Sequence, residues 1–219
     1  MKSPVIVVPF KALGRKSRLA GVLGGDDAER FAVLMLRDLL AVLKKAGKVK
    51  DAIVVSSDPH ALRIARRGGA GTLLETRDNG VNAAVEAALA AKPEAKSFLV
   101  LPTDIPLLTS EDLGRILSLA AEGFSVISPS AAFDGTNALL FTRTKMPALR
   151  YDDRSFWSHL AGLARVGARV AVLTQPGVTS DIDTEADFHG LSRVRINRAS
   201  AEFAKKAARQ WVSSSKTAG

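Results

Sequence analysis

The sequence predicts an α/β fold in which helices cover both sides of a mostly parallel sheet. Short runs of apolar, β-branched residues recur along the chain, and segments with helical periodicity separate them. This alternation indicates strand–helix–strand units with right-handed crossovers. The chain has 219 residues, of which 47% are hydrophobic and 24% are charged. It can therefore bury the core of one ordinary domain.

The first half of the chain begins with residues 4–9 (PVIVVP), an uninterrupted apolar run that is typical of a strand buried on both faces. A helix is expected over residues 26–46, where apolar residues recur with a helical period and Asp26 or Asp27 can form the cap. Further strands are expected over residues 51–56, 71–75 and 97–102, and further helices over residues 59–67, 81–91 and 109–121.

The second half continues the same alternation. Strands are expected over residues 124–129, 138–142 and 168–173, and helices over residues 155–166, 185–192 and about 199–212. The chain has no internal repeat and no long linker. We therefore expect one domain over residues 1–193, followed by a basic C-terminal helix and tail over residues 194–219.

The composition excludes several classes of protein. The chain has no cysteine, so disulfides, thiolate catalysis and cysteine-bound metals are impossible. No run of eighteen apolar residues is present, which excludes a membrane-spanning helix. The apolar run near the N-terminus is too short for a signal peptide. We therefore expect a cytoplasmic protein without a membrane partner.

The formal net charge of +9 is concentrated at the two ends of the chain. Residues 1–18 carry a net charge of +5 and residues 193–219 carry +6, so the body between them is close to neutral. A basic segment directly after the first strand favours a small anionic ligand over nucleic acid. The C-terminal charge is expected to be a solvated tail.

The loop after the first strand carries four cations around Gly14, namely Lys11, Arg15, Lys16 and Arg18. Such a loop can offer backbone N–H groups and side-chain charges to a polyphosphate. It matches neither the P-loop nor the dinucleotide-binding glycine motif. The alternative is a solvated basic loop.

Polar residues also follow the next two strands. Ser56 and Asp58 come after the second, and Gly80 and Asn82 come after the third. Gly80 permits close approach of the backbone, and the Asn82 amide can recognise a base edge or a ribose. The alternative is a plain turn with a polar residue at the start of the helix.

Carboxylates after two strands predict a metal site. Thr103 and Asp104 follow the apolar run at residues 97–102, while Asp181 and Asp183 follow a later strand. Asp181 and Asp183 share a face if the segment is extended. Together with Asp104 they could bind Mg²⁺, which prefers carboxylate oxygens, water and substrate phosphates. The alternative for the later pair is that Asp183 or Thr184 caps the next helix.

A second polar group precedes the strand at residues 138–142. Thr136 and Asn137 follow a glycine there and could clamp an anionic or hydroxylated group, or form a hairpin turn. Phe156 and Trp157 are expected in the core. Three histidines are scattered without metal-ligand spacing, so none is expected to be catalytic: His60, His159 and His189.

These motifs, taken in order, resemble the guanylyltransferases of coenzyme F420 biosynthesis, the 2-phospho-L-lactate guanylyltransferase family. The segments that carry the resemblance are residues 4–23 (PVIVVPFKALGRKSRLAGVL), 28–43 (AERFAVLMLRDLLAVL), 53–58 (IVVSSD), 98–113 (FLVLPTDIPLLTSEDL), 127–141 (ISPSAAFDGTNALLF), 155–161 (SFWSHLA) and 176–188 (PGVTSDIDTEADF).

The resemblance implies a single-domain nucleotidyltransferase similar to the GT-A glycosyltransferases, with a Rossmann-type sheet. It implies transfer of GMP from GTP to the phosphate of 2-phospho-L-lactate, phosphoenolpyruvate or 3-phospho-D-glycerate, with release of pyrophosphate. Lys16 and its basic neighbours would hold the GTP phosphates, and Asp104 with Asp181 and Asp183 would hold Mg²⁺. Lys16 and Asp104 are the expected catalytic residues. A homodimer is left open.

The full set of residues expected to bind the nucleotide is Lys11, Arg15, Lys16, Arg18, Ser56, Asp58, Gly80, Asn82 and Thr103. For the acceptor, the resemblance implies Thr136 and Ser155. Asn137 joins them because Gly-Thr-Asn forms a polar entry to a strand, and Arg154 joins them because it forms a polar pair with Ser155 at a predicted helix start, where N–H groups favour anions.

One segment departs from the family pattern. Many relatives read roughly FGPGSF where this chain reads YDDRSF at residues 151–156. Asp152 replaces a glycine there and would repel an anionic acceptor unless its carboxylate is turned away, whereas Arg154 could bind one. The identity of the acceptor is therefore open.

Two alternatives remain. A molybdopterin or sugar nucleotidyltransferase of the same fold would carry a glycine-rich first loop, and this chain has Pro9, Phe10 and Lys11 there instead. A nucleic-acid-binding protein would interleave aromatic residues with the C-terminal cations, and only Phe203 and Trp211 qualify.

Overall fold

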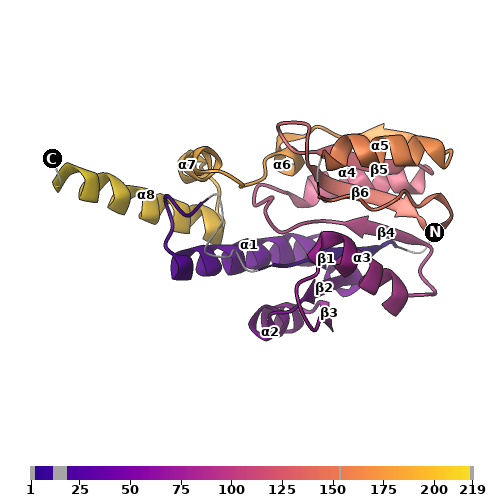
Figure 1. Cartoon of the computed structure of the whole chain (residues 1–219), viewed down its shortest axis with the longest axis horizontal. Helices are drawn as coiled ribbons and strands as arrows, with labels where there is room; N and C mark the ends of the chain where they lie inside the picture. The colour runs from indigo at the N-terminus through magenta and orange to yellow at the C-terminus, as the bar shows by residue number, and fades with distance from the viewer. Residues whose placement is uncertain (1–2, 12–18, 153, 218–219) are drawn as a thin grey trace.

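A computed structural model describes residues 3–11, 19–152 and 154–217. Its centre is a seven-stranded sheet of order β3-β2-β1-β4-β6-β5-β7 (Figure 1). Strand β6 is antiparallel to both neighbours, and the other pairings are parallel. The strands are β1 (Val5–Pro9), β2 (Ala52–Ser56), β3 (Gly71–Leu74), β4 (Ser97–Val100), β5 (Ser125–Pro129), β6 (Thr136–Thr142) and β7 (Val170–Val172).

The α-helices are α1 (Gly25–Lys45), α2 (Pro59–Gly68), α3 (Gly80–Ala91), α4 (Ser110–Ala121), α5 (Ser155–Arg165), α6 (Pro176–Thr179), α7 (Glu185–Arg193) and α8 (Ala199–Thr217). The predicted α/β fold with a mostly parallel sheet is confirmed. Three short elements were not predicted: α6 and the 3₁₀ turns at Val49–Asp51 and Arg143–Lys145. None of the described helices is long and apolar enough to cross a membrane.

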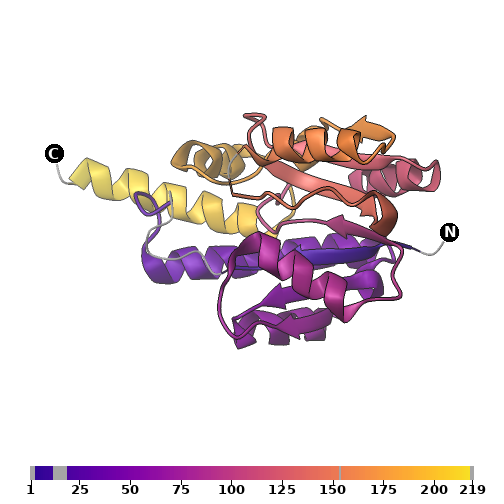
Figure 2. The same cartoon turned by 45° about the vertical axis from the view of Figure 1, so that its right-hand side comes forward.

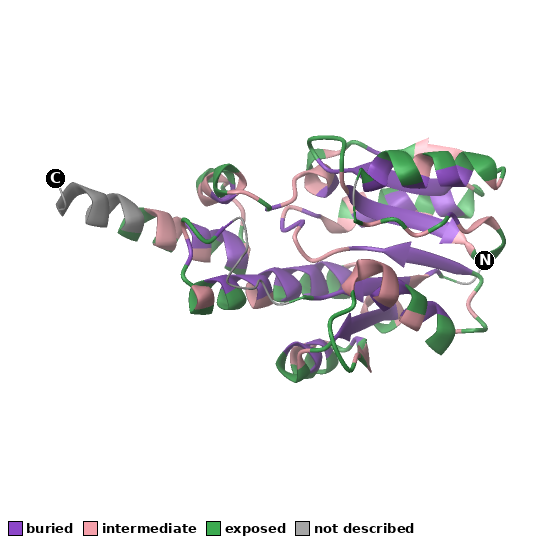
Figure 3. Ribbon diagram, viewed as in Figure 1, coloured by how far each residue is buried: buried purple, intermediate pink, exposed green. Residues whose placement is uncertain are grey.

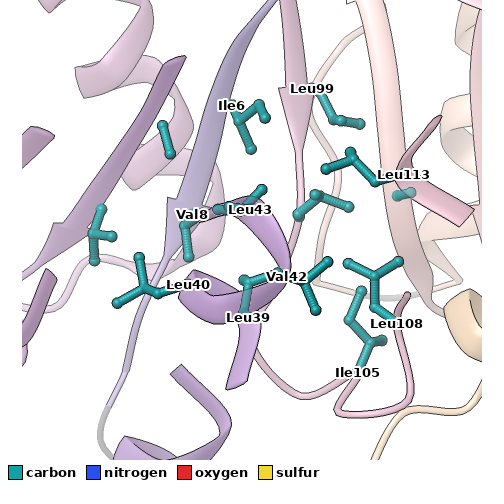
Figure 4. Close-up of a cluster of buried hydrophobic side chains, with 14 of the residues drawn as sticks. Ile6, Val8, Leu39, Leu40, Val42, Leu43, Leu99, Ile105, Leu108 and Leu113 are labelled. Atoms are coloured by element: carbon teal, nitrogen blue, oxygen red, sulfur yellow. The ribbon is translucent and has the colours of Figure 1, made fainter. Parts of the chain in front are cut away.

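Alternation along the strands divides the core between the two faces of the sheet. Ile6 and Val8 in β1 point toward α1, α2 and α4, while Val7 between them points toward α3 and α5. Figure 4 shows the first cluster, in which Leu39 and Leu43 of α1 lie close to Val8 of β1. Burying each such side chain contributes about 1.5–3 kcal/mol, so both layers hold the sheet edge in place.

A third cluster joins α1, α7 and α8 beyond the sheet. Phe31 of α1 lies at its centre, with its ring 5.2 Å from that of Phe188 and 5.8 Å from that of Phe203. Figures 1 and 2 both show the start of α8 beside α1 and the rest of the helix extending away from the body toward the C-terminus. Ser200, Ala201 and Ala204 are fully buried, and the burial colours of Figure 3 show this docked start of the helix. The buried residues of this part are small or apolar, whereas the basic Lys206 and Arg209 are exposed, which agrees with the expectation of solvated charge on a C-terminal helix.

Helix caps follow the expected chemistry at two sites. Thr109 begins α4 with a capping box to Asp112, and Thr184, one of the two caps that the sequence offered for α7, begins that helix in the same way with Asp187. The predicted cap of α1 is wrong, because that helix begins one residue earlier, after Gly24, and Asp26 and Asp27 lie in its first turn.

Candidate active site

The predicted site residues come together at one edge of the sheet. The parallel strands end at this edge and the antiparallel β6 begins there. The described residues that flank it are Lys11, Ser56, Asp58, Gly80, Asn82, Thr103, Asp104, Thr136, Asn137, Arg154, Ser155, Asp181 and Asp183. Arg15, Lys16 and Arg18, predicted to bind phosphates, lie outside the described residues.

Asp104 is the most unusual carboxylate of this edge. Its Oδ1 atom is buried and has no hydrogen-bond partner among the residues that the structure describes. Burial, together with the nearby charges of Asp183 and Asp181, raises the pKa of Asp104 to about 7. The backbone N–H of Ile182 donates to the carbonyl of Asp104 at 2.9 Å. This bond ties the end of β4 to the segment that carries the other two carboxylates.

Asp181 and Asp183 lie near Asp104, but the three carboxylates do not form a ready set of metal ligands. Burial raises the pKa of Asp181, and a hydrogen bond from the Asn137 side chain opposes this effect. Asp183 is exposed. Among the residues that the structure describes, no group of three or more His, Asp or Glu side chains is arranged to hold a metal ion. The expected set of three ligands is thus not preassembled.

Asn137 was expected to bind the acceptor, yet its side chain is buried and engaged elsewhere. Its Nδ2 donates to the carbonyl of Val178 at 3.0 Å, and it also bonds Asp181. It therefore fastens α6 and Asp181 to β6. This placement favours an indirect role, in which Asn137 orients a carboxylate.

The predicted nucleotide residues after β2 and β3 are also engaged by the protein. Ser56 Oγ accepts from the N–H of Asp58, and Asp58 caps α2 by accepting from the N–H of His60 at 2.7 Å. Gly80 has φ of +94°, a conformation that suits glycine, and begins α3. Lys11 forms an ion pair of 3.0 Å with Asp78, which precedes Gly80. The first and third strand ends are thus linked.

Asn82 binds the segment that departs from the family pattern. Its Oδ1 accepts from the N–H of Tyr151 at 3.0 Å, and its Nδ2 donates to Oδ2 of Asp152 at 2.9 Å. The Asp152 carboxylate is therefore held by α3. The amide expected to recognise a base or a ribose instead connects α3 to the loop before α5.

A buried hydroxyl pair occupies the acceptor side of the edge. Ser155 Oγ donates to Thr136 Oγ1 at 3.0 Å, and Nδ1 of His159 lies 3.0 Å from the same oxygen. Nε2 of His159 accepts from the backbone N–H of Arg150 at 2.9 Å. Thr136, Ser155 and His159 expose 6%, 4% and 0% of their surface, so this network is shielded from bulk water.

A β-bulge aims Thr136 at this network. Ser128 pairs with Ala138 but Pro129 pairs with Thr136, so Asn137 is an extra residue in β6. Thr136 therefore reaches α5 on one face of the sheet, while Asn137 reaches α6 on the other. The hairpin turn that the sequence left as an alternative for this segment is present between β5 and β6.

His159 was not expected in the site, because the three histidines of the chain are scattered along the sequence. The available signal was its spacing from Ser155, because residues four apart share one face of a helix. Phe156 is buried as predicted, but Trp157 is 50% exposed, so its expected place in the core is wrong. Trp157 is adjacent in sequence to Phe156, and its side chain leaves the helix on a different face.

A comparison with protein families matches residues 4–218 to the family described as "Guanylyl transferase CofC like". The chain belongs to this family. The match includes α8, which lay beyond the segments that carried the resemblance. The C-terminal helix is thus part of what the chain shares with CofC-like guanylyltransferases.

Two curated relatives of this CofC-like chain illustrate the range of acceptors. It is 39% identical over 186 residues to phosphoenolpyruvate guanylyltransferase of Rubrobacter xylanophilus, covering 83% of this chain and 90% of the relative. It is 30% identical over 189 residues to 2-phospho-L-lactate guanylyltransferase of Methanothermobacter thermautotrophicus, covering 86% and 83%.

Solved structures support the fold of this CofC-like chain. A putative nucleotide-diphospho-sugar transferase from Desulfovibrio desulfuricans has a TM-score of 0.72 at 15% identity and covers 94% of this chain and 97% of its own. The Rv0371c protein from Mycobacterium tuberculosis, solved in complex with manganese, has a TM-score of 0.60 at 22% identity and covers 88% and 100%. At these identities the likeness concerns the fold alone.

Proposed function

We propose that this chain transfers the guanylyl group of GTP to the phosphate of a three-carbon phospho-acid and releases pyrophosphate. The observation that carries this proposal is the buried Oδ1 of Asp104, which has no partner within the described part of the chain and lies near two further carboxylates, in a chain of the CofC-like family. The acceptors of the two relatives support phosphoenolpyruvate or 2-phospho-L-lactate, and 3-phospho-D-glycerate is the third candidate.

The residues present fit Mg²⁺. A carboxylate oxygen without a partner suits a hard cation, and Mg²⁺ needs only one or two protein carboxylates because it keeps water and substrate phosphates as ligands. Asp104 would hold the ion, with Asp181 or Asp183 completing its protein ligands. Bound there, Mg²⁺ would offset negative charge on the phosphates of GTP during transfer.

The reaction needs no general base from the protein. An oxygen of the acceptor's phosphate attacks the α-phosphorus of GTP, the bond from that phosphorus to the bridging oxygen breaks, and pyrophosphate leaves. A phosphate dianion is already a nucleophile at neutral pH, so the protein contributes by positioning and by charge neutralisation. An edge rich in carboxylates and cations fits this requirement.

We assign the nucleotide to the side of the edge at β1 to β3 and the acceptor to the side at β6 and α5. Lys11 lies beside Gly80 at the first side, and Lys16 with Arg15 and Arg18 would add charge for the phosphates. Thr136, Ser155 and Arg154 would bind the phospho-acid. The Asn82–Asp152 bond supports this assignment, because it holds the Asp152 carboxylate against α3.

A direct assay tests the proposal. The purified chain is incubated with Mg²⁺, one nucleoside triphosphate and one of the three phospho-acids, and pyrophosphate release is measured. We expect release with GTP and at least one acid, and much less with ATP, CTP or UTP. Equal rates without any phospho-acid would indicate hydrolysis and contradict the proposal.

A further inference from the structure

His159 is a fully buried histidine whose two ring nitrogens both have partners, although the transfer reaction requires no histidine. It lies in α5, one turn after Ser155, and its ring is 4.6 Å from that of Tyr151. Burial lowers the pKa of His159 to about 4, so the ring is neutral at physiological pH. Each ring nitrogen therefore has a fixed role as donor or acceptor.

The hydrogen bond from Arg150 decides which nitrogen carries the proton. A backbone N–H can only donate, so Nε2 of His159 must accept from it. The neutral ring then carries its proton on Nδ1. Nδ1 lies 3.0 Å from Thr136 Oγ1 and consequently donates to that oxygen.

This donation determines what the Thr136 hydroxyl can offer to a ligand. Oγ1 also receives the proton of Ser155 Oγ, so both of its acceptor positions are filled. Its own proton is left to donate to a further acceptor. The Thr136 hydroxyl is thereby a donor only, which matches an anionic oxygen and penalises a ligand group that must itself donate.

We propose that His159 is a positioning residue that fixes the Thr136 hydroxyl as a donor toward an anionic oxygen of the phospho-acid. The inference rests on the proposed function, because it takes Thr136 to lie in the acceptor site. The β-bulge at Asn137 is also required, because it turns the Thr136 side chain toward α5, where His159 lies.

Two substitutions of His159 separate this role from simple packing. His159→Asn places an amide N–H near the position of Nδ1 and keeps the donation to Thr136. His159→Gln reaches the position of Nε2, keeps an acceptor for Arg150 and loses the donation to Thr136. We expect the glutamine variant to raise the KM for the phospho-acid about tenfold with the KM for GTP nearly unchanged. The asparagine variant should stay within about threefold of wild type.

A double-mutant cycle with Thr136→Val tests whether His159 acts through Thr136. In that background, His159→Gln should change the KM for the acid no further. Additive effects, or equal KM values for the asparagine and glutamine variants, would overturn the proposal. Nitrogen NMR of the folded wild-type chain at neutral pH supplies a readout independent of activity. It should show the proton of His159 on Nδ1, and a proton on Nε2 would also overturn the proposal.

The activity of the wild-type chain distinguishes a failure of the proposed function from a failure of the role proposed for His159. If the wild-type chain releases pyrophosphate equally fast with and without a phospho-acid, the proposed function fails and this inference fails with it. If the wild-type chain is active but His159→Gln keeps its KM for the acid, only the role of His159 is overturned.

Discussion

Asp38 of α1 caps a helix that begins 161 residues later in the chain. Its Oδ2 accepts from the N–H of Ser200 at 2.9 Å and from Ser200 Oγ at 2.6 Å, and its Oδ1 accepts from the N–H of Ala199 at 3.0 Å. Asp38 is buried, and a carboxylate with several N–H and O–H donors suits the positive end of a helix. This contact fixes the start of α8 on the body of the protein.

Removing this carboxylate should loosen α8. Asp38→Ala deletes the cap and leaves buried donors without an acceptor, so we expect the free energy of unfolding to fall by roughly 2–4 kcal/mol. Ser200→Ala removes only the hydroxyl and should cost about 1 kcal/mol. Urea unfolding measures both variants. As a control, Glu111→Ala breaks an exposed ion pair of 3.7 Å with Lys45 and should have little effect. An Asp38→Ala variant as stable as wild type would show that the cap is not needed.

Asp104 should matter far more for turnover than for folding. Asp104→Asn keeps the shape of the side chain and removes its charge. We expect pyrophosphate release to fall by two or more orders of magnitude, about 3 kcal/mol of transition-state stabilisation. Circular dichroism checks that the variant is folded. Near-normal turnover by a folded variant would remove Asp104 from the metal site.

The raised pKa of Asp104 predicts a specific pH dependence without metal. In the folded state the carboxyl ionises near pH 7, whereas in the unfolded state it ionises near its ordinary value of 3.8. Between these values the folded state holds more protons, so its stability falls as the pH rises. Asp104→Asn lacks this loss. In EDTA, we expect its stability relative to wild type to be greater at pH 8 than at pH 5 by on the order of 2–3 kcal/mol. A difference that stays constant with pH would contradict the assignment.

Arg154 combines backbone strain with a charge for the acceptor. Its φ of +43° lies in the left-handed region that favours glycine. Arg154→Gly and Arg154→Ala both remove the guanidinium, so both should raise the KM for the phospho-acid about tenfold to hundredfold and spare GTP. Only the glycine relieves the strain, so it should be about 1 kcal/mol more stable than the alanine variant. Weaker binding of GTP with the acid unaffected would reverse the assignment of the two sides.

Gly177 seats α6 against the start of α4. A Cβ at this position would collide with Oδ2 of Asp112, the capping-box carboxylate, and would lie 3.1 Å from the carbonyl oxygen of Leu107. We expect Gly177→Ala to cost about 1–3 kcal/mol in urea unfolding. Gly114→Ala is the matched control, because nothing lies within 4 Å of its added Cβ and alanine favours a helix. A neutral Gly177→Ala would mean that α6 moves freely.

The sequence predicted the layers well because the signals for them are local. Strand alternation, such as Ile6 and Val8 on one face with Val7 on the other, follows from the period of a strand. The location of the site at the edge where the strands end could also be predicted, because ligands bind beyond the carboxyl ends of parallel strands. The position of Asp104 could therefore be predicted, since it directly follows an apolar strand.

The contacts within the site depend on strand pairing and on contacts between residues far apart in the sequence, and local sequence patterns do not predict these. The bulge at Asn137 becomes visible only when β5 is paired with β6, and it reverses which face Thr136 and Asn137 reach. The Asn82–Asp152 bond joins residues 70 positions apart. Periodicity alone cannot show that the amide of Asn82, the third residue of α3, already binds the loop before α5.

Phosphorus NMR of the complete reaction tests the central claim most directly. The chain is incubated with GTP, Mg²⁺ and each phospho-acid in turn. The account predicts the signals of a new pyrophosphate diester, in which the acceptor phosphate is joined to GMP, together with an equal amount of inorganic pyrophosphate. GDP with inorganic phosphate, or GMP and pyrophosphate without the diester, would show hydrolysis and contradict guanylyl transfer to a phospho-acid.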